Sequence, residues 1–81
     1  MEETTLNAAI DPVKTGKNIR EAMNHKNLTV RDITLALGLS TPNAVYKWLC
    51  GDTVPSIDNI YALSLLLDSS LDELIAGRVV L

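Results

Sequence analysis

The sequence predicts an all-α fold: a compact domain of five helices with a helix-turn-helix at its centre. Two observations lead to this prediction. Apolar residues recur at helical spacing along most of the chain, as at Val30, Ile33 and Leu37, and before the C-terminal tail no segment alternates like a strand. Gly38 then separates two such periodic segments, and glycine adopts the positive φ of a tight turn without steric cost.

The composition is that of one globular domain. The chain has 81 residues, so a single small core is expected. It contains no Phe and one Trp, so leucine and isoleucine must supply most of that core. No apolar run approaches the ~18 residues that cross a membrane, and the acidic N-terminus does not resemble a secretory signal. The lone cysteine, Cys50, excludes an internal disulfide and favours a cytoplasmic location.

Charge is divided unevenly along the chain. The net charge of −3 by itself disfavours a polyanionic partner. Residues 14–47, however, hold six basic and two acidic side chains, whereas both flanking segments are acidic. The local field steers an anionic ligand, so this basic segment is compatible with DNA binding, although ordinary solvated lysines would give the same pattern.

Three segments are expected along the chain. Residues 1–10 mix polar and small side chains without a sustained period, which predicts a flexible leader. Residues 11–77 are assigned to the helical domain. Residues 78–81 form a short apolar tail that either frays or pairs with its copy in a dimer.

The first two helices have recognisable ends. Asp11 caps the first helix, with Pro12 at its first position, and the helix runs to about residue 26. Asn27 is predicted to end it in the left-handed conformation. Thr29 caps a second helix over about 30–37, and Thr29 with Asp32 resembles a capping box. Leu35 falls on the outer side of this helix, where it is either half-buried or in contact with another chain.

Three further helices are expected after Gly38. The third covers about 42–50, with Pro42 in its first turn and Gly51 as its stop. Val54, in the loop that follows, is expected to pack into the core. Ser56 caps a fourth helix, and Ser70 caps a short fifth helix that Gly77 ends. The apolar residues at helical spacing on these last two helices are expected to face inward: Ile57, Ile60, Leu63, Leu66, Leu67, Leu71, Leu74 and Ile75.

The sequence contains no catalytic constellation. The one histidine, His25, lies in a polar helix end with no sign of a nucleophile and acid around it, so a hydrolytic triad is not supported. One cysteine and one histidine cannot form a four-ligand metal site, and no glycine-rich phosphate loop follows a strand. We therefore expect no enzyme, no metal and no cofactor.

Surface recognition by the third helix is the remaining hypothesis. Its start carries Thr41, Asn43 and Ala44, and Asn can bond adenine while Ala or a Thr methyl can meet the methyl group of thymine. Tyr46 and Lys47, one turn further, can reach phosphates, and helix N-termini give Thr29 and Ser40 a similar role. Four of these residues also have a plainer interpretation. Thr41 and Asn43 are then helix caps, Lys47 is solvated, and Tyr46 packs its ring on the second helix.

These residues resemble the XRE-type helix-turn-helix family, the phage-repressor-like DNA-binding domains of bacteria. The resemblance covers about residues 15–75. It rests on Ile19, Leu28, Thr29, Ile33, Leu37, Gly38, Leu39, Ser40, Trp48, Gly51, Pro55, Ser56, Ile60, Leu63 and residues 70–74. Residues 40–48, STPNAVYKW, are similar to a subgroup that reads S-x-P-Q/N-A-V-Y-K-W.

The resemblance implies a repressor-like regulator of transcription that binds double-stranded DNA sequence-specifically, often as a homodimer. It implies a recognition helix over about 42–50 in the major groove. The DNA contacts that it implies are Thr41, Asn43, Ala44, Tyr46 and Lys47, with Thr29 and Arg31 on phosphate. Besides Ser40 at a helix start, the basic residues Lys14, Lys17 and Arg20 are further possible phosphate contacts.

The chain also departs from the family at three places. The distance from Gly38 to Gly51 is one residue longer than in the commonest members. Val30 replaces a glutamine that contacts the DNA backbone, and Thr34 replaces a small alanine between the two helices.

One alternative function stays open, that of a protein-interaction module such as an antitoxin-like or regulator-binding partner. The acidic second half, Leu35 and the apolar tail favour it. Neither hypothesis involves a membrane or a small-molecule ligand domain.

Overall fold

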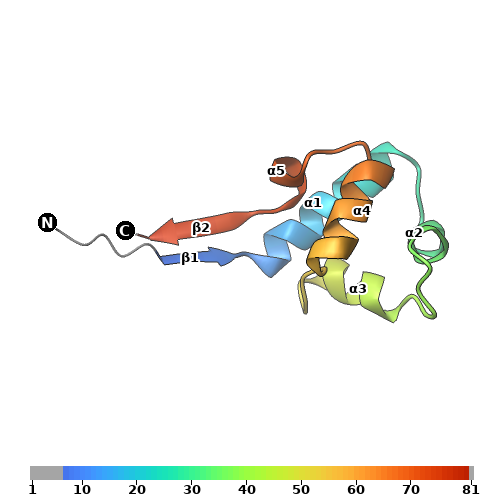
Figure 1. Ribbon diagram of the computed structural model, residues 1–81, viewed down its shortest axis with the longest axis horizontal. Coiled ribbons are helices and arrows are strands. Elements are labelled where there is room, and N and C mark those ends of the chain that lie inside the picture. Colours follow the sequence, from blue (N-terminus) through green and yellow to red (C-terminus); the bar gives the residue numbers. More distant parts are fainter. Residues whose placement is uncertain (1–6, 81) are drawn as a thin grey trace, which may run out of the picture.

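The computed structural model describes residues 7–80, which form five helices and a two-stranded ribbon (Figure 1). The elements are β1 (Asn7–Ile10), α1 (Pro12–His25), α2 (Val30–Ala36), α3 (Asn43–Cys50), α4 (Ile57–Leu66), α5 (Leu71–Leu74) and β2 (Gly77–Val80). The predicted five-helix domain is confirmed, and the helix ends agree with the predicted ends to within a few residues. No helix of the described residues is long and apolar enough to cross a membrane.

Side-chain caps set where four of the helices begin, as their sequences predicted. The Asp11 carboxylate accepts from the N–H of Lys14 at 3.0 Å, and the Ser56 hydroxyl accepts from the N–H of Asn59 at 3.3 Å. Thr29 and Ser70 each take part in a complete capping box. These bonds satisfy N–H groups that have no partner inside the helix.

Left-handed residues end four of the helices. Asn27 and Asp68 adopt φ of 56° and 50°, and Gly38 and Gly51 adopt 68° and 80°. The predicted roles of Asn27, Gly38 and Gly51 are therefore confirmed. Helices often end on such a residue because it lets the following N–H groups bond back to the last carbonyls.

The core lies between the inner faces of all five helices. It is made of ten buried residues: Ile19, Met23, Ile33, Val45, Trp48, Leu49, Ile60, Leu63, Leu67 and Leu74. α1 and α3 approach most closely at Gly16, where a Cβ atom would overlap the carbonyl oxygen of Trp48 and lie 2.9 Å from that of Leu49. This glycine therefore lets the two helices pack backbone to backbone.

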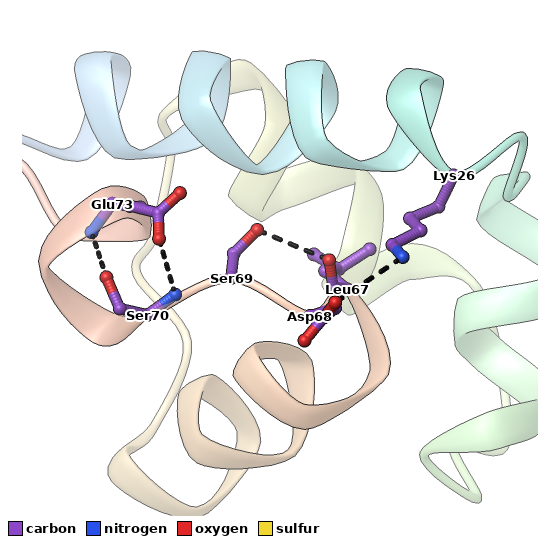
Figure 2. A network of polar contacts seen from close by, with 6 residues as sticks. All are labelled: Lys26, Leu67, Asp68, Ser69, Ser70 and Glu73. Atoms are coloured by element: carbon purple, nitrogen blue, oxygen red, sulfur yellow. Dashed lines mark hydrogen bonds and ion pairs between the residues drawn. The ribbon is translucent and has the colours of Figure 1, made fainter.

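Figure 2 shows the polar contacts around the connection between α4 and α5, of which the Lys26–Asp68 ion pair reaches the end of α1. The N–H of Ser70 donates to the Glu73 carboxylate at 3.1 Å, and the N–H of Glu73 donates to the Ser70 hydroxyl at 3.2 Å. Lys26, just after α1, forms an ion pair with Asp68 at 3.7 Å. The Asn18 side chain donates to the carbonyl oxygen of Leu74 at 3.2 Å. These contacts hold α5 against α1.

The ribbon is a correction to the sequence analysis. Residues 7–10, assigned to a flexible leader, form β1, and most of the tail 78–81 lies in β2. The two strands pair antiparallel, with Ile10 opposite Gly77 and Asn7 opposite Val80. The rest of the predicted leader, residues 1–6, lies outside the described residues. Four-residue strands with so little alternation carry no strand signal, and their pairing depends on residues about seventy positions apart.

Three side chains expected in the core are exposed instead. Ile57 is 83% exposed, and Leu71 and Val54 are also exposed. Helical spacing placed Ile57 and Leu71 on apolar helix faces, and Val54 was expected to pack from its loop, but the described residues leave all three exposed. They form a surface that is described further below.

Candidate nucleic-acid interface

The turn between α2 and α3 is built on Gly38. Its N–H donates to the carbonyl oxygen of Leu35 at 3.2 Å, and the N–H of Leu39 donates to that of Thr34 at 3.0 Å. A Cβ atom at Gly38 would meet nothing within 4 Å. The turn therefore needs glycine for its φ of 68° and not for space. The two helices that it joins form the predicted helix-turn-helix.

The start of α3 agrees with the predicted start at about residue 42. Pro42 already has helical dihedral angles, with φ −78° and ψ −1°, and its carbonyl oxygen accepts from the N–H of Tyr46 at 3.1 Å. The Thr41 hydroxyl accepts from the N–H of Asn43 at 3.4 Å. Pro42 thus stands at the N-cap of α3, where its missing N–H removes no helical bond, and the Thr41 hydroxyl just before it bonds to the first helical N–H.

α3 has one buried face and one exposed face. Val45, Trp48 and Leu49 are buried in the core. Asn43, Tyr46 and Lys47 are exposed, and Ala44 is half-buried. Ser40 and Thr41 are exposed before the helix begins. Asn43, Tyr46 and Lys47 therefore lie on the side of α3 that the core leaves free, while the half-buried Ala44 also packs against the core.

The start of α2 carries the Thr29 capping box. The N–H of Thr29 donates to the Asp32 carboxylate at 2.8 Å, and the Thr29 hydroxyl accepts from the N–H of Asp32 at 3.1 Å. Hydrogen bonds from the backbone N–H and the side chain of Thr29, aided by the positive charge of Arg31, lower the pKa of the Asp32 carboxyl below its ordinary value. Asp32 is therefore ionised at neutral pH. The N–H of Thr29 is occupied, which leaves its hydroxyl as the group that can meet a phosphate.

Arg31 and Tyr46 meet in a shallow groove between α2 and α3. The groove has a volume of about 280 Å³ and is also lined by Val30, Thr34, Leu35 and Pro42. Thr34 fits beside α3 because its hydroxyl donates to the carbonyl oxygen of Val30 at 2.8 Å, inside its own helix. Leu35 is exposed at this groove rather than half-buried. The sequence analysis did not foresee that Tyr46 and Arg31 share one surface.

The remaining basic candidates lie on α1. Lys14, Lys17 and Arg20 are exposed on this helix, whose buried side, including Gly16 and Ile19, packs on the rest of the domain. Among residues 7–80 the one ion pair joins Lys26 to Asp68. The basic side chains on α1, α2 and α3 thus have no acidic partner within 4 Å in this part of the chain. No hydrogen bond there links the α1 cations to the residues of α2 and α3.

A second exposed surface was missed by sequence reasoning. Ile57, Tyr61 and Leu65 of α4 are 83%, 59% and 67% exposed, and they follow one another at four-residue spacing. We call these three residues the α4 stripe. Ile57 and Tyr61 also line an apolar groove of about 450 Å³ with Ile10, Val54 and Leu71. The spacing was visible in the sequence, but a buried and an exposed apolar stripe look alike there.

Comparison with known proteins identifies the family. A helix-turn-helix family model matches residues 19–74, which include α2, α3 and α4. The chain belongs to the XRE-type helix-turn-helix family. It is a DNA-binding transcriptional regulator, and the predicted function is confirmed at this level.

A solved structure agrees with this family. The restriction-modification controller protein C.AhdI from Aeromonas hydrophila superimposes on this regulator with a TM-score of 0.70 at 31% sequence identity. The match covers 79% of this chain and 96% of that one. A comparison with curated protein sequences gives no significant match.

Proposed function

We propose that this regulator is a repressor-like protein of the cytoplasm that binds a two-fold symmetric DNA site as a homodimer. The start of α3 enters the major groove of each half-site. The observation that carries this proposal is the free face of α3, on which Asn43, Tyr46 and Lys47 are exposed while the opposite face is locked into the core. A helix so held can present its first turn to base edges without rearranging.

Base reading is assigned to Thr41, Asn43 and Ala44. The side-chain amide of Asn43 makes no hydrogen bond among residues 7–80, so both its donor and its acceptor are available to an adenine. Ala44 and the Thr41 methyl group supply apolar contact for a thymine methyl. We also assign the chain to the subgroup with an S-x-P-Q/N-A-V-Y-K-W recognition helix, in which Asn43 takes the place of glutamine.

Phosphate binding is assigned to Arg31, Tyr46, Lys47, Ser40 and the Thr29 hydroxyl. Arg31 and Tyr46 line one groove, so a single phosphate could meet both. The ionised Asp32 beside Thr29 weakens the attraction at the start of α2, and Arg31 compensates for it. The three cations of α1 are proposed as an outer set that reaches the DNA backbone beyond the half-site.

The α4 stripe is proposed as the contact between the two copies. A surface with three large apolar side chains in a row, next to an apolar groove, is expected to be covered in solution. A second copy fits this role because two half-sites of DNA require two copies of α3 related by a two-fold axis. The likeness to a restriction-modification controller protein supports a DNA-binding regulator.

The salt dependence of DNA binding tests the assignment of phosphate contacts. If Arg31 and Lys47 alone bind phosphates, a dimer neutralises about four of them and the slope of log K against log salt is about −3.6. If Lys14, Lys17 and Arg20 also bind, the slope approaches about −9. Fluorescence anisotropy with a selected duplex, from about 50 to 200 mM salt, separates the two. A slope near zero would contradict DNA binding through the backbone.

Two substitutions separate base reading from phosphate binding. Asn43→Ala should reduce the preference for the selected site over random duplex by about 1–3 kcal/mol at one position in each half-site. Lys47→Ala should weaken both duplexes alike and make the salt slope shallower by about 2 per dimer. Equal effects of the two substitutions on every sequence would contradict the division of roles.

A further inference from the structure

The ribbon of β1 and β2 leaves both of its edges unpaired within residues 7–80. The sheet has two strands, in the order β1–β2. A two-stranded ribbon is marginal in water on its own, and a free edge is a template for a further strand. The ribbon also lies outside the family match, which begins at residue 19 and ends at residue 74. The helix-turn-helix function does not explain it.

The base of the ribbon is fixed to the helical core. The N–H of Asp11 donates to the carbonyl oxygen of Ala76 at 2.8 Å. The buried Thr15 hydroxyl accepts from the N–H of Ala76 at 3.0 Å and donates to its carbonyl oxygen at 3.4 Å. The start of α1 is therefore joined to the backbone on both sides of Ala76, the residue just before β2. The ribbon projects from this anchor away from the helices, at the end opposite α2 (Figure 1).

The bond at the base determines which backbone groups face outward. In an antiparallel pair, bonded and non-bonded residue pairs alternate. Asp11 bonds to Ala76, so the next bonded pair joins Ala9 to Arg78, and the pair between Ile10 and Gly77 is non-bonded. The N–H and C=O groups of Ala8 and Ile10 consequently point away from β2. They present two donors and two acceptors along the free edge of β1.

We propose that the β1 edges of two copies pair antiparallel about a two-fold axis and join the two ribbons into a four-stranded sheet. In this register Ala8 of each copy bonds to Ile10 of the other, and the two Ala9 residues face each other at the axis. The pairing is self-complementary because the two outward residues are exchanged by the symmetry. It rests on the homodimer proposed above and names a contact separate from the α4 stripe.

Charge selects the β1 edge over the β2 edge. β1 has no charged residue, and its central pair would be two small alanines. The corresponding two-fold pairing of β2 would place Arg78 directly opposite its copy, and like charges across a sheet destabilise the pair. A charged residue on an edge strand is also a common means of blocking it. Arg78 thus leaves β1 as the edge that accepts a second copy.

The apolar groove connects this edge to the α4 stripe. Ile10 of β1 lines the groove with Ile57 and Tyr61, so the ribbon edge and the stripe belong to one continuous surface. In the proposed register the two Asp11 residues lie four residues apart along the sheet, about 14 Å. Because each ribbon projects away from its helices, the two helical domains then lie at opposite ends of the four-stranded sheet (Figure 1).

Disulfide trapping tests the register. In a Cys50→Ser background, Ala9→Cys should form a cross-linked dimer under mild oxidation, because a non-bonded antiparallel pair brings the two Cα atoms to about 4.5 Å. Asn24→Cys in the same background is the control, since residue 24 is exposed on α1 and takes no part in the ribbon. It should stay monomeric on a denaturing gel. Equal cross-linking of the two variants, or none with Ala9→Cys, would overturn the proposal.

Sedimentation of the full chain separates this proposal from the homodimer itself. Ala8→Pro removes an outward N–H without breaking a bond to β2, and should weaken dimerisation about tenfold or more. Ala8→Val retains the N–H and should dimerise like the wild type. If Ile57→Asp abolishes the dimer while Ala8→Pro leaves it unchanged, the homodimer stands and the ribbon pairing is wrong. If the wild type stays monomeric at all concentrations, both are wrong.

Discussion

Replacing Gly16 by alanine tests the packing that orients the recognition helix. The added Cβ would overlap the carbonyl oxygen of Trp48 and lie 2.9 Å from that of Leu49. Both are backbone atoms of α3, so no side chain can rotate to make room. α1 and α3 must separate, and the core between them must loosen.

The expected magnitude combines two opposing effects. Alanine is favoured over glycine in a helix interior by about 1 kcal/mol, which alone would stabilise the variant. Overpacking against rigid backbone costs up to about 3 kcal/mol, so the net change should be a loss of about 2 kcal/mol. For a domain of this size, that loss lowers the melting temperature by roughly 8–16 °C.

Urea unfolding followed by the fluorescence of the single, buried Trp48 provides the assay. Lys17→Ala, at the next, exposed position of α1, is the control and should change stability by less than about 0.5 kcal/mol. A Gly16→Ala variant as stable as the wild type, or more stable, would show that helix propensity decides and that the close approach of α1 to α3 does not constrain the fold.

Three further predictions concern single contacts. Gly38→Ala should cost about 1–2 kcal/mol from its positive φ alone, because a Cβ there meets no neighbour; a loss as large as that of Gly16→Ala in the same urea assay would be unexpected. Thr15→Val should cost about 1–3 kcal/mol, because it leaves the N–H of Ala76 without its partner, and thermal melting measures it. The pKa of Asp32 is lower in the folded state than in the unfolded state, so its ionised carboxylate stabilises the fold. This contribution to stability is complete above the ordinary Asp pKa of about 3.9 and is lost as the pH falls through the lower folded-state value. The stability difference between wild type and Asp32→Asn, followed by circular dichroism, should therefore shrink in acid; a difference that grows there would contradict the capping box.

Local chemistry allowed the helices and their ends to be predicted. The side chains of four cap residues accept from a backbone N–H three positions further on: Asp11, Thr29, Ser56 and Ser70. Both partners of each bond therefore lie within one short segment of the sequence. The same holds for Gly38, whose role depends on its own φ. The free face of α3 also follows from helical spacing once the buried residues are identified.

The features that escaped prediction depend on distant parts of the chain. β1 pairs with β2 across almost the whole sequence, and neither strand is long enough to show a period. Ile57 and Leu71 were expected in the core because periodicity marks an apolar face without saying how much chain is available to cover it. The groove shared by Arg31 and Tyr46 depends on how α2 packs on α3, which spacing within one helix does not fix.

Selection of binding sites from a random duplex library tests the central claim most directly, that the first turn of α3 reads bases in a dimer. The wild type should enrich two inverted half-sites with centres about 34 Å apart, one turn of DNA. Asn43→Ala, selected in parallel, should keep that spacing and lose the preference at one base in each half-site. An enriched site without two-fold symmetry, or an identical site for both proteins, would contradict the account.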